Sequence, residues 1–278
     1  MSDPRLTLMR EGVAALSLLG QVRADRYAPT TAARCVVAAA AIRKAADAAS
    51  EQQDQIIFGE VFDILFEDRG FAFGQARRDG YVGFVALAAL AKGLVEPSHW
   101  VSALRTYAFA EPDLKTATTG LFTLNSLVAV EQTDGRFAKI SDGGWVVASH
   151  LSPIGDYASD PAGVASLFLN APYQWGGRES AGLDCSGLIQ QALYACGQAG
   201  PRDTDMQAAA LGKPIERDEL RRNDLVFWRG HVGIMVDEFR LLHANAHHMM
   251  TAVEPVADAI ARISSAGAGA PTAFKRLA

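Results

Sequence analysis

The chain has 278 residues, of which 49% are hydrophobic and 21% are charged, so it can build buried cores and is not intrinsically disordered. It carries 26 Lys and Arg against 31 Asp and Glu, and the net charge of −5 excludes a broadly cationic surface for nucleic acid. No apolar run approaches the roughly 18 residues that cross a bilayer. We therefore expect a small-molecule, peptide or protein partner, without nucleic acid and without a membrane.

Residues 1–32 are predicted to form an N-terminal helical segment. The stretch from Gly12 to Gly20 is short and apolar, like the core of a signal peptide. Asp3 and Glu11 place acid where a signal peptide carries positive charge, and no small-residue cleavage site follows. We therefore interpret the stretch as an amphipathic helix packed on its own domain. The three cysteines are too few for a disulfide framework, and we expect a cytoplasmic protein.

Short alternating apolar runs separated by Gly, Asp and Asn extend from Cys35 to His150, which is the pattern of an all-β structure. A weak internal repeat relates the two halves of this region. Asp79-Gly-Tyr-Val-Gly-Phe-Val85 in the first half corresponds to Asp142-Gly-Gly-Trp-Val-Val147 in the second. Each half has the length of a small barrel. We predict two SH3-like β-barrels, over 33–91 and 98–151, and the pattern resembles tandem bacterial SH3 domains.

The remaining region, 158–278, changes in character. Pro161 to Leu169 and Leu183 to Cys196 have the apolar spacing of helices, and strands follow from Leu225 onward. Helices followed by antiparallel strands form an α+β unit. The sequence therefore predicts an α+β domain after two small barrels.

The second of these helices carries a candidate nucleophile. Asp184 is a suitable N-cap, so Cys185 falls in the first turn of the helix. The unpaired backbone N–H groups and the helix dipole favour a thiolate there, and the thiolate is the nucleophilic form of cysteine. The alternative is an inert buried cysteine. We assign that alternative to Cys196, which lies on the apolar face of the same helix.

A thiolate nucleophile requires a base and a group that orients the base. His231 and His243 lie on consecutive strands, and a loop with an odd number of residues, or a bulge, would place both on one face. A two-residue loop would separate them. The order Cys185, His231, His243 then predicts nucleophile, general base and orienting residue. His243, His247 and His248 also suggest metal ligands, but no cysteine or carboxylate has the spacing to complete a shell. We expect no metal and no cofactor.

Several motifs resemble those of the NlpC/p60 family of cell-wall cysteine peptidases, which are papain-like enzymes that cut peptidoglycan stem peptides. They are Tyr173-x-Trp-Gly-Gly177, Asp184-Cys-Ser-Gly187, Gly230-His-Val-Gly-Ile234 and Leu242-His-Ala244. Together with the two barrels, they resemble the γ-D-glutamyl-L-diamino acid endopeptidases. The resemblance implies a papain-like α+β catalytic domain preceded by two SH3-like barrels. It implies as substrate the peptide L-Ala-γ-D-Glu-diamino acid with a free N-terminus.

The resemblance also implies a pocket for the free amine of L-Ala. Asp184 and Ser186 would hold this amine beside the nucleophile. Tyr81, in a Tyr-x-Gly-aromatic element of the first barrel, would close the pocket, and Glu60 would supply a further acid. Alternatively, Tyr81 is a plain barrel aromatic and Glu60 a solvated strand residue.

Three further residues are implied near the scissile bond. Tyr173 would stabilise the oxyanion together with the backbone N–H of Cys185, or would simply pack beside Trp175. Asp203 and Thr204 would belong to a substrate-lining loop, although Asp203 could instead cap a helix.

Two other functions are compatible with the sequence. One is a non-catalytic protein in which the SH3-like barrels bind peptide, and the other is a thiol-dependent amidase or acyltransferase on the same fold. The sequence also leaves open whether the third substrate residue is diaminopimelate or lysine. It leaves open the choice between recycling, remodelling and an effector role, and it does not define the oligomeric state.

Overall fold

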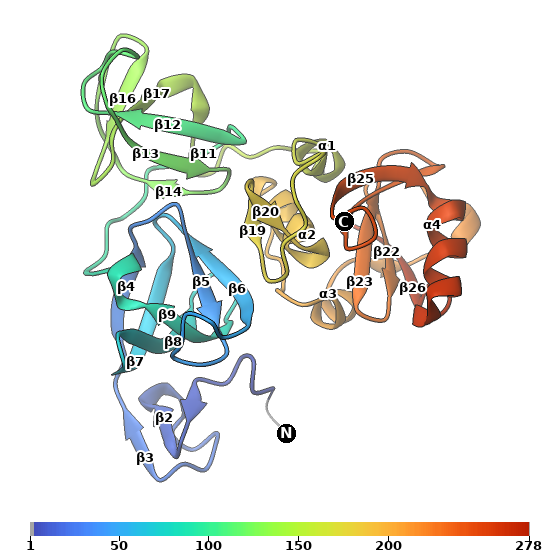
Figure 1. Ribbon diagram of the computed structural model, residues 1–278, viewed down its shortest axis with the longest axis horizontal. Coiled ribbons are helices and arrows are strands. Elements are labelled where there is room, and N and C mark those ends of the chain that lie inside the picture. Colours follow the sequence, from blue (N-terminus) through green and yellow to red (C-terminus); the bar gives the residue numbers. More distant parts are fainter. Residues whose placement is uncertain (1–2, 278) are drawn as a thin grey trace. The chain divides into compact units, whose positions relative to one another are not determined.

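The computed structural model describes residues 3–277 and divides into two compact units, Met1–Ile154 and Gly155–Ala278 (Figure 1). The first unit is built from β-strands and short turns of 3₁₀ helix, and the second combines helices with a six-stranded sheet. The chain is therefore of the α+β class. Within residues 3–277, the helices are too short or too polar to cross a bilayer.

The N-terminal segment is not helical, so the prediction for 1–32 is wrong; residues 1 and 2 lie outside the described residues. A three-stranded sheet is present instead, formed by β1 (Met9–Arg10), β2 (Val13–Ala15) and β3 (Arg26–Ala28), with one 3₁₀ turn at Leu16–Leu18. The apolar stretch is too short for a stable isolated helix. The carbonyl of Gly12 accepts from the backbone N–H groups of Asp25 and Arg26, which ties the two ends of the segment together.

The first barrel follows directly and forms one seven-stranded sheet in the order β10-β4-β7-β8-β9-β5-β6. Its elements are β4 (Thr31–Cys35), β5 (Ala39–Arg43), β6 (Gln52–Ile57), β7 (Val61–Asp68), β8 (Phe71–Ala76), β9 (Val82–Ala86), a 3₁₀ turn (Leu87–Ala89) and β10 (Leu90–Lys92). Alternate strand residues fill its core, which includes Ile42, Phe62 and Tyr81.

The second barrel is formed by two sheets, in the orders β14-β11-β18 and β13-β12-β17-β16-β15. Its elements are β11 (His99–Val101), β12 (Arg105–Phe109), β13 (Thr118–Thr123), β14 (Leu127–Val128), β15 (Val130–Asp134), β16 (Phe137–Ile140), β17 (Gly144–Val147), a 3₁₀ turn (Ala148–His150) and β18 (Leu151–Pro153). Arg43 pairs with Phe84 across β5 and β9, and Phe109 pairs with Trp145 across β12 and β17. The sequence repeat thus corresponds to equivalent strand pairs.

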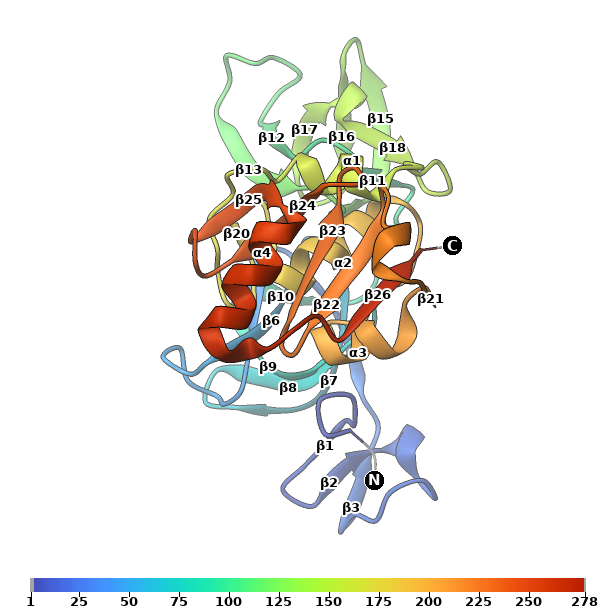
Figure 2. The same cartoon turned by 90° about the vertical axis from the view of Figure 1, so that its right-hand side faces the viewer.

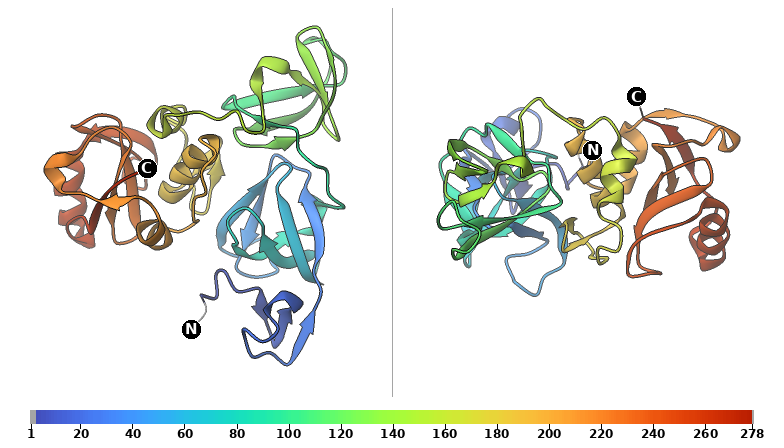
Figure 3. Two further views of the ribbon diagram at one scale, coloured as in Figure 1. Left: turned by 180° about the vertical axis from the view of Figure 1, so that it is seen from behind. Right: turned by 90° about the horizontal axis from the view of Figure 1, so that it is seen from above.

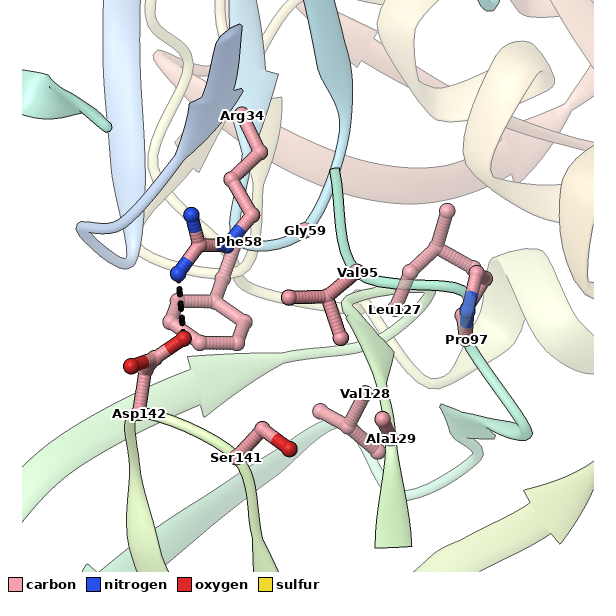
Figure 4. A pocket seen from close by; sticks show the side chains of 10 residues that line it. All are labelled: Arg34, Phe58, Gly59, Val95, Pro97, Leu127, Val128, Ala129, Ser141 and Asp142. Atoms are coloured by element: carbon pink, nitrogen blue, oxygen red, sulfur yellow. Dashed lines mark hydrogen bonds and ion pairs between the residues drawn. The ribbon is translucent and has the colours of Figure 1, made fainter. Parts of the chain in front are cut away.

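A tight joint connects the two barrels (Figure 4). Arg34 of the first barrel forms an ion pair with Asp142 of the second, and the N–H of Leu127 donates to the carbonyl of Phe58 at 2.9 Å. Only about 10 Å³ remains between the lining residues. Gly59 has a φ of +83°, and a Cβ there would overlap the backbone carbonyl of Leu127. Glycine is therefore required at this close approach.

The second unit is organised around a sheet in the order β21-β26-β22-β23-β24-β25. Its helices are α1 (Pro161–Ser166), α2 (Cys185–Ala195), α3 (Thr204–Ala210) and α4 (Val256–Ile263), with a 3₁₀ turn at Arg217–Glu219 and a π turn at Ser264–Ala268. Its strands are β19 (Arg178–Glu179), β20 (Gly182–Leu183), β21 (Lys213–Pro214), β22 (Asp224–Trp228), β23 (His231–Met235), β24 (Arg240–Asn245), β25 (Met250–Pro255) and β26 (Ala273–Arg276).

Helices cover both faces of this sheet. Helix α2 packs on β23 and β24, and α4 lies on the opposite face (Figures 2 and 3). The apolar residues Val256, Ala259 and Ile263 of α4 share a core with Trp228 and Met235. This arrangement brings the N-terminus of α2 to the beginning of β23, where the predicted catalytic residues lie.

We predict that Gly59→Ala destabilises the first unit more than Gly70→Ala does. Gly70 also has a positive φ, of +82°, but no atom lies within 4 Å of the place that a Cβ would occupy. Gly70→Ala should cost about 1 kcal/mol from the left-handed backbone alone, and Gly59→Ala at least twice as much because of the added overlap. Thermal unfolding of the two variants measures this, and equal losses would show that the joint tolerates a Cβ.

Candidate active site

The N-terminus of α2 has the predicted geometry. Asp184 is the N-cap, and its Oδ1 accepts from the backbone N–H of Gly187 at 2.8 Å. Cys185 follows in the first turn and is 7% exposed. Backbone N–H groups of Ser186 and of Val232, on β23, interact with its sulfur. The nucleophile predicted from sequence is thus placed against the strand that begins with His231.

The hairpin of β23 and β24 brings the two histidines together. Val236 pairs with Arg240 around the loop 237–239, which has an odd number of residues. His231 and His243 consequently lie on one face, with His231 Nε2 at 2.8 Å from His243 Nδ1. The alternative of a two-residue loop is excluded.

A carboxylate that the sequence analysis missed extends this pair. Glu254 Oε1 lies 2.8 Å from His243 Nε2 and also forms an ion pair with Arg262. Sequence spacing gives no carboxylate that would complete a metal shell at the histidine cluster, but the fold brings ligand atoms of His243, His248 and Glu254 within 4.8 Å of one another. The Arg262 guanidinium on Glu254 opposes the binding of a cation there.

The hydrogen bonds define which nitrogen of each ring carries a proton. The hydrogen bond from His243 and the Arg262 guanidinium lower the pKa of Glu254 to about 2, so its carboxylate accepts the proton of His243 Nε2–H. His243 Nδ1 is then an acceptor for His231 Nε2–H. The lone pair of His231 Nδ1 remains available, and Nδ1 is the nitrogen that serves as the base.

Burial disfavours the charged forms of both Cys185 and His231. It raises the pKa of the Cys185 thiol to about 12, aided by the Asp184 carboxylate, and backbone N–H groups oppose the shift only in part. It lowers the pKa of His231 to about 3, aided by His243 and Arg262. The backbone N–H groups at the helix terminus favour the thiolate, as the sequence argument holds, but burial outweighs them.

A buried ion pair fixes the residues on either side of the nucleophile. Arg202 Nη2 lies 2.6 Å from Asp184 Oδ2, and Arg202 Nη1 lies 3.0 Å from Oδ1 and 2.8 Å from Ser186 Oγ. Gly176 N–H donates to Asp184 Oδ2 at 2.9 Å. Asp184 is thus already paired within the protein, and contact of Asp184 or Ser186 with a substrate amine stays a prediction. Arg202 directly precedes Asp203 and Thr204, the predicted substrate-lining residues, but the sequence does not identify its partner.

Tyr173 is suited to donate a hydrogen bond. Burial raises the pKa of its phenol, and the Asp184 carboxylate raises it further, so the hydroxyl stays protonated. Its backbone forms a β-bridge to Leu183. Asp203 occupies the N-cap position of α3 without a side-chain capping bond, and Thr204 is the first residue of that helix. The roles of all three toward substrate stay predictions.

Tyr81 and Glu60 belong to the first unit. Tyr81 is 3% exposed and lies in the barrel core. Glu60 is 2% exposed, so the alternative of a solvated strand residue is wrong. Its Oε1 accepts from Arg78 Nη1 at 2.8 Å and its Oε2 from the N–H of Ile57 at 3.1 Å. Contact of either residue with substrate stays a prediction.

Comparison with known families decides the class of this site. The NlpC/P60 family matches residues 170–263, and the bacterial dipeptidyl-peptidase SH3 domain matches residues 42–90. The second unit is an NlpC/P60 domain. The first barrel is a bacterial dipeptidyl-peptidase SH3 domain, as the sequence resemblance predicted.

Individual relatives agree with this assignment. The γ-D-glutamyl-L-lysine dipeptidyl-peptidase of Bacillus subtilis is 27% identical over 215 residues, which are 69% of this chain and 72% of that protein. Dipeptidyl-peptidase 6 of Lysinibacillus sphaericus is 29% identical over 36% of each chain. The crystal structure of an NlpC/P60 family protein from Bacillus cereus covers 89% of this chain and 99% of its own, with a TM-score of 0.75 and 16% identity, and so shares the fold. The chain is a hydrolase of a peptidase family.

We predict that His231 and His243 both carry their ring proton on Nε2 at neutral pH, because the chain of acceptors begins at the ionised Glu254. Nitrogen NMR of the imidazole rings distinguishes the two tautomers. His99, whose Nδ1 contacts the neutral hydroxyl of Ser98, serves as a reference ring outside the NlpC/P60 domain. A proton on Nδ1 of His231 would contradict the assignment of that nitrogen as the base.

Proposed function

We propose that the chain is a cysteine peptidase that hydrolyses the γ-D-Glu–diamino acid bond of peptidoglycan stem peptides with a free N-terminal L-Ala. The observation that carries the proposal is the hydrogen-bonded pair of His231 and His243 at the N-terminus of the helix that bears Cys185. Its setting in an NlpC/P60 domain preceded by a dipeptidyl-peptidase SH3 domain supports the substrate class.

The proposed reaction uses only side chains of the chain and water. Cys185 Sγ attacks the amide carbon while its proton moves to His231 Nδ1. The backbone N–H of Cys185 and the hydroxyl of Tyr173 donate to the oxyanion of the tetrahedral intermediate. The imidazolium of His231 then protonates the leaving amine, which breaks the C–N bond and leaves a thioester. Water, deprotonated by His231, attacks the thioester, and the acid product and the thiol are released.

Selection for a free amine rests on the first barrel in this proposal. Asp184 is already paired with Arg202, so it contributes to the amine site as part of a charge network. Glu60 likewise accepts from Arg78 and from the N–H of Ile57, so it too would contribute to the amine site as part of a charge network. Glu60 and Tyr81 are the proposed contacts of the first barrel for the ammonium group of L-Ala.

The hydrogen-bonded histidine pair favours an enzyme over a protein that only binds peptide, since a scaffold would not require a buried base. An amidase or acyltransferase would use the same residues, and product analysis distinguishes it. We further propose that the chain acts in the cytoplasm on released wall fragments. Its three cysteines are free thiols, a state that a reducing compartment maintains. Whether the third residue is diaminopimelate or lysine is left to the same product analysis.

We predict that Cys185→Ala reduces hydrolysis of L-Ala-γ-D-Glu-diaminopimelate to background and leaves the fold intact, because it removes the nucleophile but only one sulfur atom from the first turn of α2. His231→Ala should lower the rate of hydrolysis nearly as much, and His243→Ala should lower it less. Cys196→Ala, at the other end of α2, is the matched control and should keep its activity. Mass spectrometry of the products measures turnover, and wild-type turnover by Cys185→Ala would exclude the mechanism.

We predict that N-acetylation of the tripeptide lowers kcat/KM by at least ~10-fold, because it removes a charge-assisted hydrogen bond of about 1.5–3 kcal/mol. Tyr81→Phe should reduce the ratio of kcat/KM between the free and the acetylated tripeptide by a larger factor than it reduces kcat. Phe is the suitable replacement, since a smaller residue would leave a cavity in the barrel core around Tyr81. Equal kcat/KM values for the free and acetylated peptides in the wild type would show that the first barrel does not select a free N-terminus.

A further inference from the structure

Two charged residues outside the predicted catalytic set are joined to the histidine pair. Glu254 lies on β25 and Arg262 on α4, and their side chains are 14% and 26% exposed. Glu254 Oε1 lies 2.8 Å from His243 Nε2, and the same oxygen accepts from Arg262. His243 itself is fully buried. Glu254 therefore connects the buried ring of His243 to the surface.

The fold holds both charges in place. Ala252 of β25 lies opposite His243, and Glu254, two residues further along, points to the same side of the sheet as His243. Helix α4 begins at Val256, directly after β25, and its apolar residues anchor it in the core beside Trp228. Arg262 is carried on the last turn of this anchored helix. The contact is thus built from the strand register and the helix packing, unlike an ion pair between two mobile surface chains.

We propose that Glu254 is a positioning residue of the catalytic pair, which orients His243 and stabilises the imidazolium of His231, and that Arg262 limits this stabilisation. This inference rests on the proposed function, because it assigns a role within the same site. When His231 Nδ1 takes the proton of Cys185, positive charge develops on a ring joined through His243 to the Glu254 carboxylate. The carboxylate favours that charge, and the guanidinium of Arg262 opposes it.

Other charged and titratable groups also lie around the pair of His231 and His243. His248, from the turn between β24 and β25, lies with its ring centre 6.5 Å from that of His243. Cys185, on α2, interacts with the backbone N–H of Val232, the residue after His231, and its own surroundings hold Tyr173, Asp184 and Arg202. Of the groups that the structure describes here, Glu254 is the anion that bonds directly to the histidine pair.

The roles of the two partners predict effects of opposite sign. Glu254→Gln keeps the size of the side chain and an oxygen that can accept from His243, but removes the negative charge. The thiolate–imidazolium pair should then be less populated near pH 7. Arg262→Met removes the opposing cation and should make the same pair more populated. An ion pair with a purely structural role would instead give losses in both variants.

The rate of Cys185 alkylation by iodoacetamide, followed across pH by mass spectrometry of the Cys185 peptide, measures this population without any substrate. Near pH 7, we expect about 10-fold slower alkylation in Glu254→Gln and faster alkylation than wild type in Arg262→Met. The two variants should converge with wild type at high pH, where the thiol ionises without the histidine. In Glu254→Gln, kcat for the tripeptide should fall about 10-fold or more while KM stays close to that of the wild type.

Arg240→Met is the matched control. It removes an ion pair of 2.6 Å with Asp237 at the tip of the same hairpin but leaves the bonds of Asp237 to the backbone of the turn in place, so it should behave as wild type. Wild-type alkylation profiles in both test variants, or slower alkylation in both, would overturn the proposal. If Glu254→Gln does not fold, the sign of the Arg262→Met effect still decides it. A wild-type protein with the expected profiles but no tripeptide cleavage would refute the proposed function and leave this inference standing.

Discussion

The register of one hairpin determines whether this protein has a catalytic site. Side chains alternate between the faces of a strand, so a slip of one residue between β23 and β24 would send one histidine to the opposite face. The loop 237–239 sets the register, and the Asp237 carboxylate accepts from the backbone N–H groups of Phe239 and Arg240 within it. The 2.8 Å bond between His231 and His243 depends on this turn, although no residue of the turn touches the histidines.

The position of Cys185, the proposed nucleophile, likewise depends on the contacts of a single residue. Asp184 caps α2, receives the Gly176 N–H and pairs with Arg202, so one carboxylate joins the helix start, the preceding loop and the segment before α3. Burying this ion pair is costly unless every partner is in place, which makes the cluster rigid. Rigid placement of Cys185 matters because small errors in the approach of a nucleophile lower the rate strongly.

Local signals in the sequence were sufficient for much of this structure. The N-cap before Cys185 and the tandem barrels follow from spacing and turn residues. The hairpin of His231 and His243 was predicted, but the length of its loop, which places both rings on one face, came from the structure. The helical prediction for residues 1–32 failed because pairing between strands distant in sequence outweighed a short apolar pattern. Glu254 was missed for a related reason: its position beside His243 depends on the register of β25. The raised pKa of the thiol likewise reflects burial by the whole domain, which a motif does not encode.

The neutral resting state of the Cys185 thiol also bears on how the enzyme survives oxidants. Peroxide reacts with thiolates far faster than with thiols, and oxidation beyond the sulfenic acid is irreversible for most cysteines. A site that held a permanent thiolate would lose activity whenever oxidant reached it. Here the sulfur is buried, and burial raises the pKa of its thiol. The burial that makes ionisation of Cys185 depend on a base in the proposed mechanism would therefore also protect its sulfur from oxidation between turnovers.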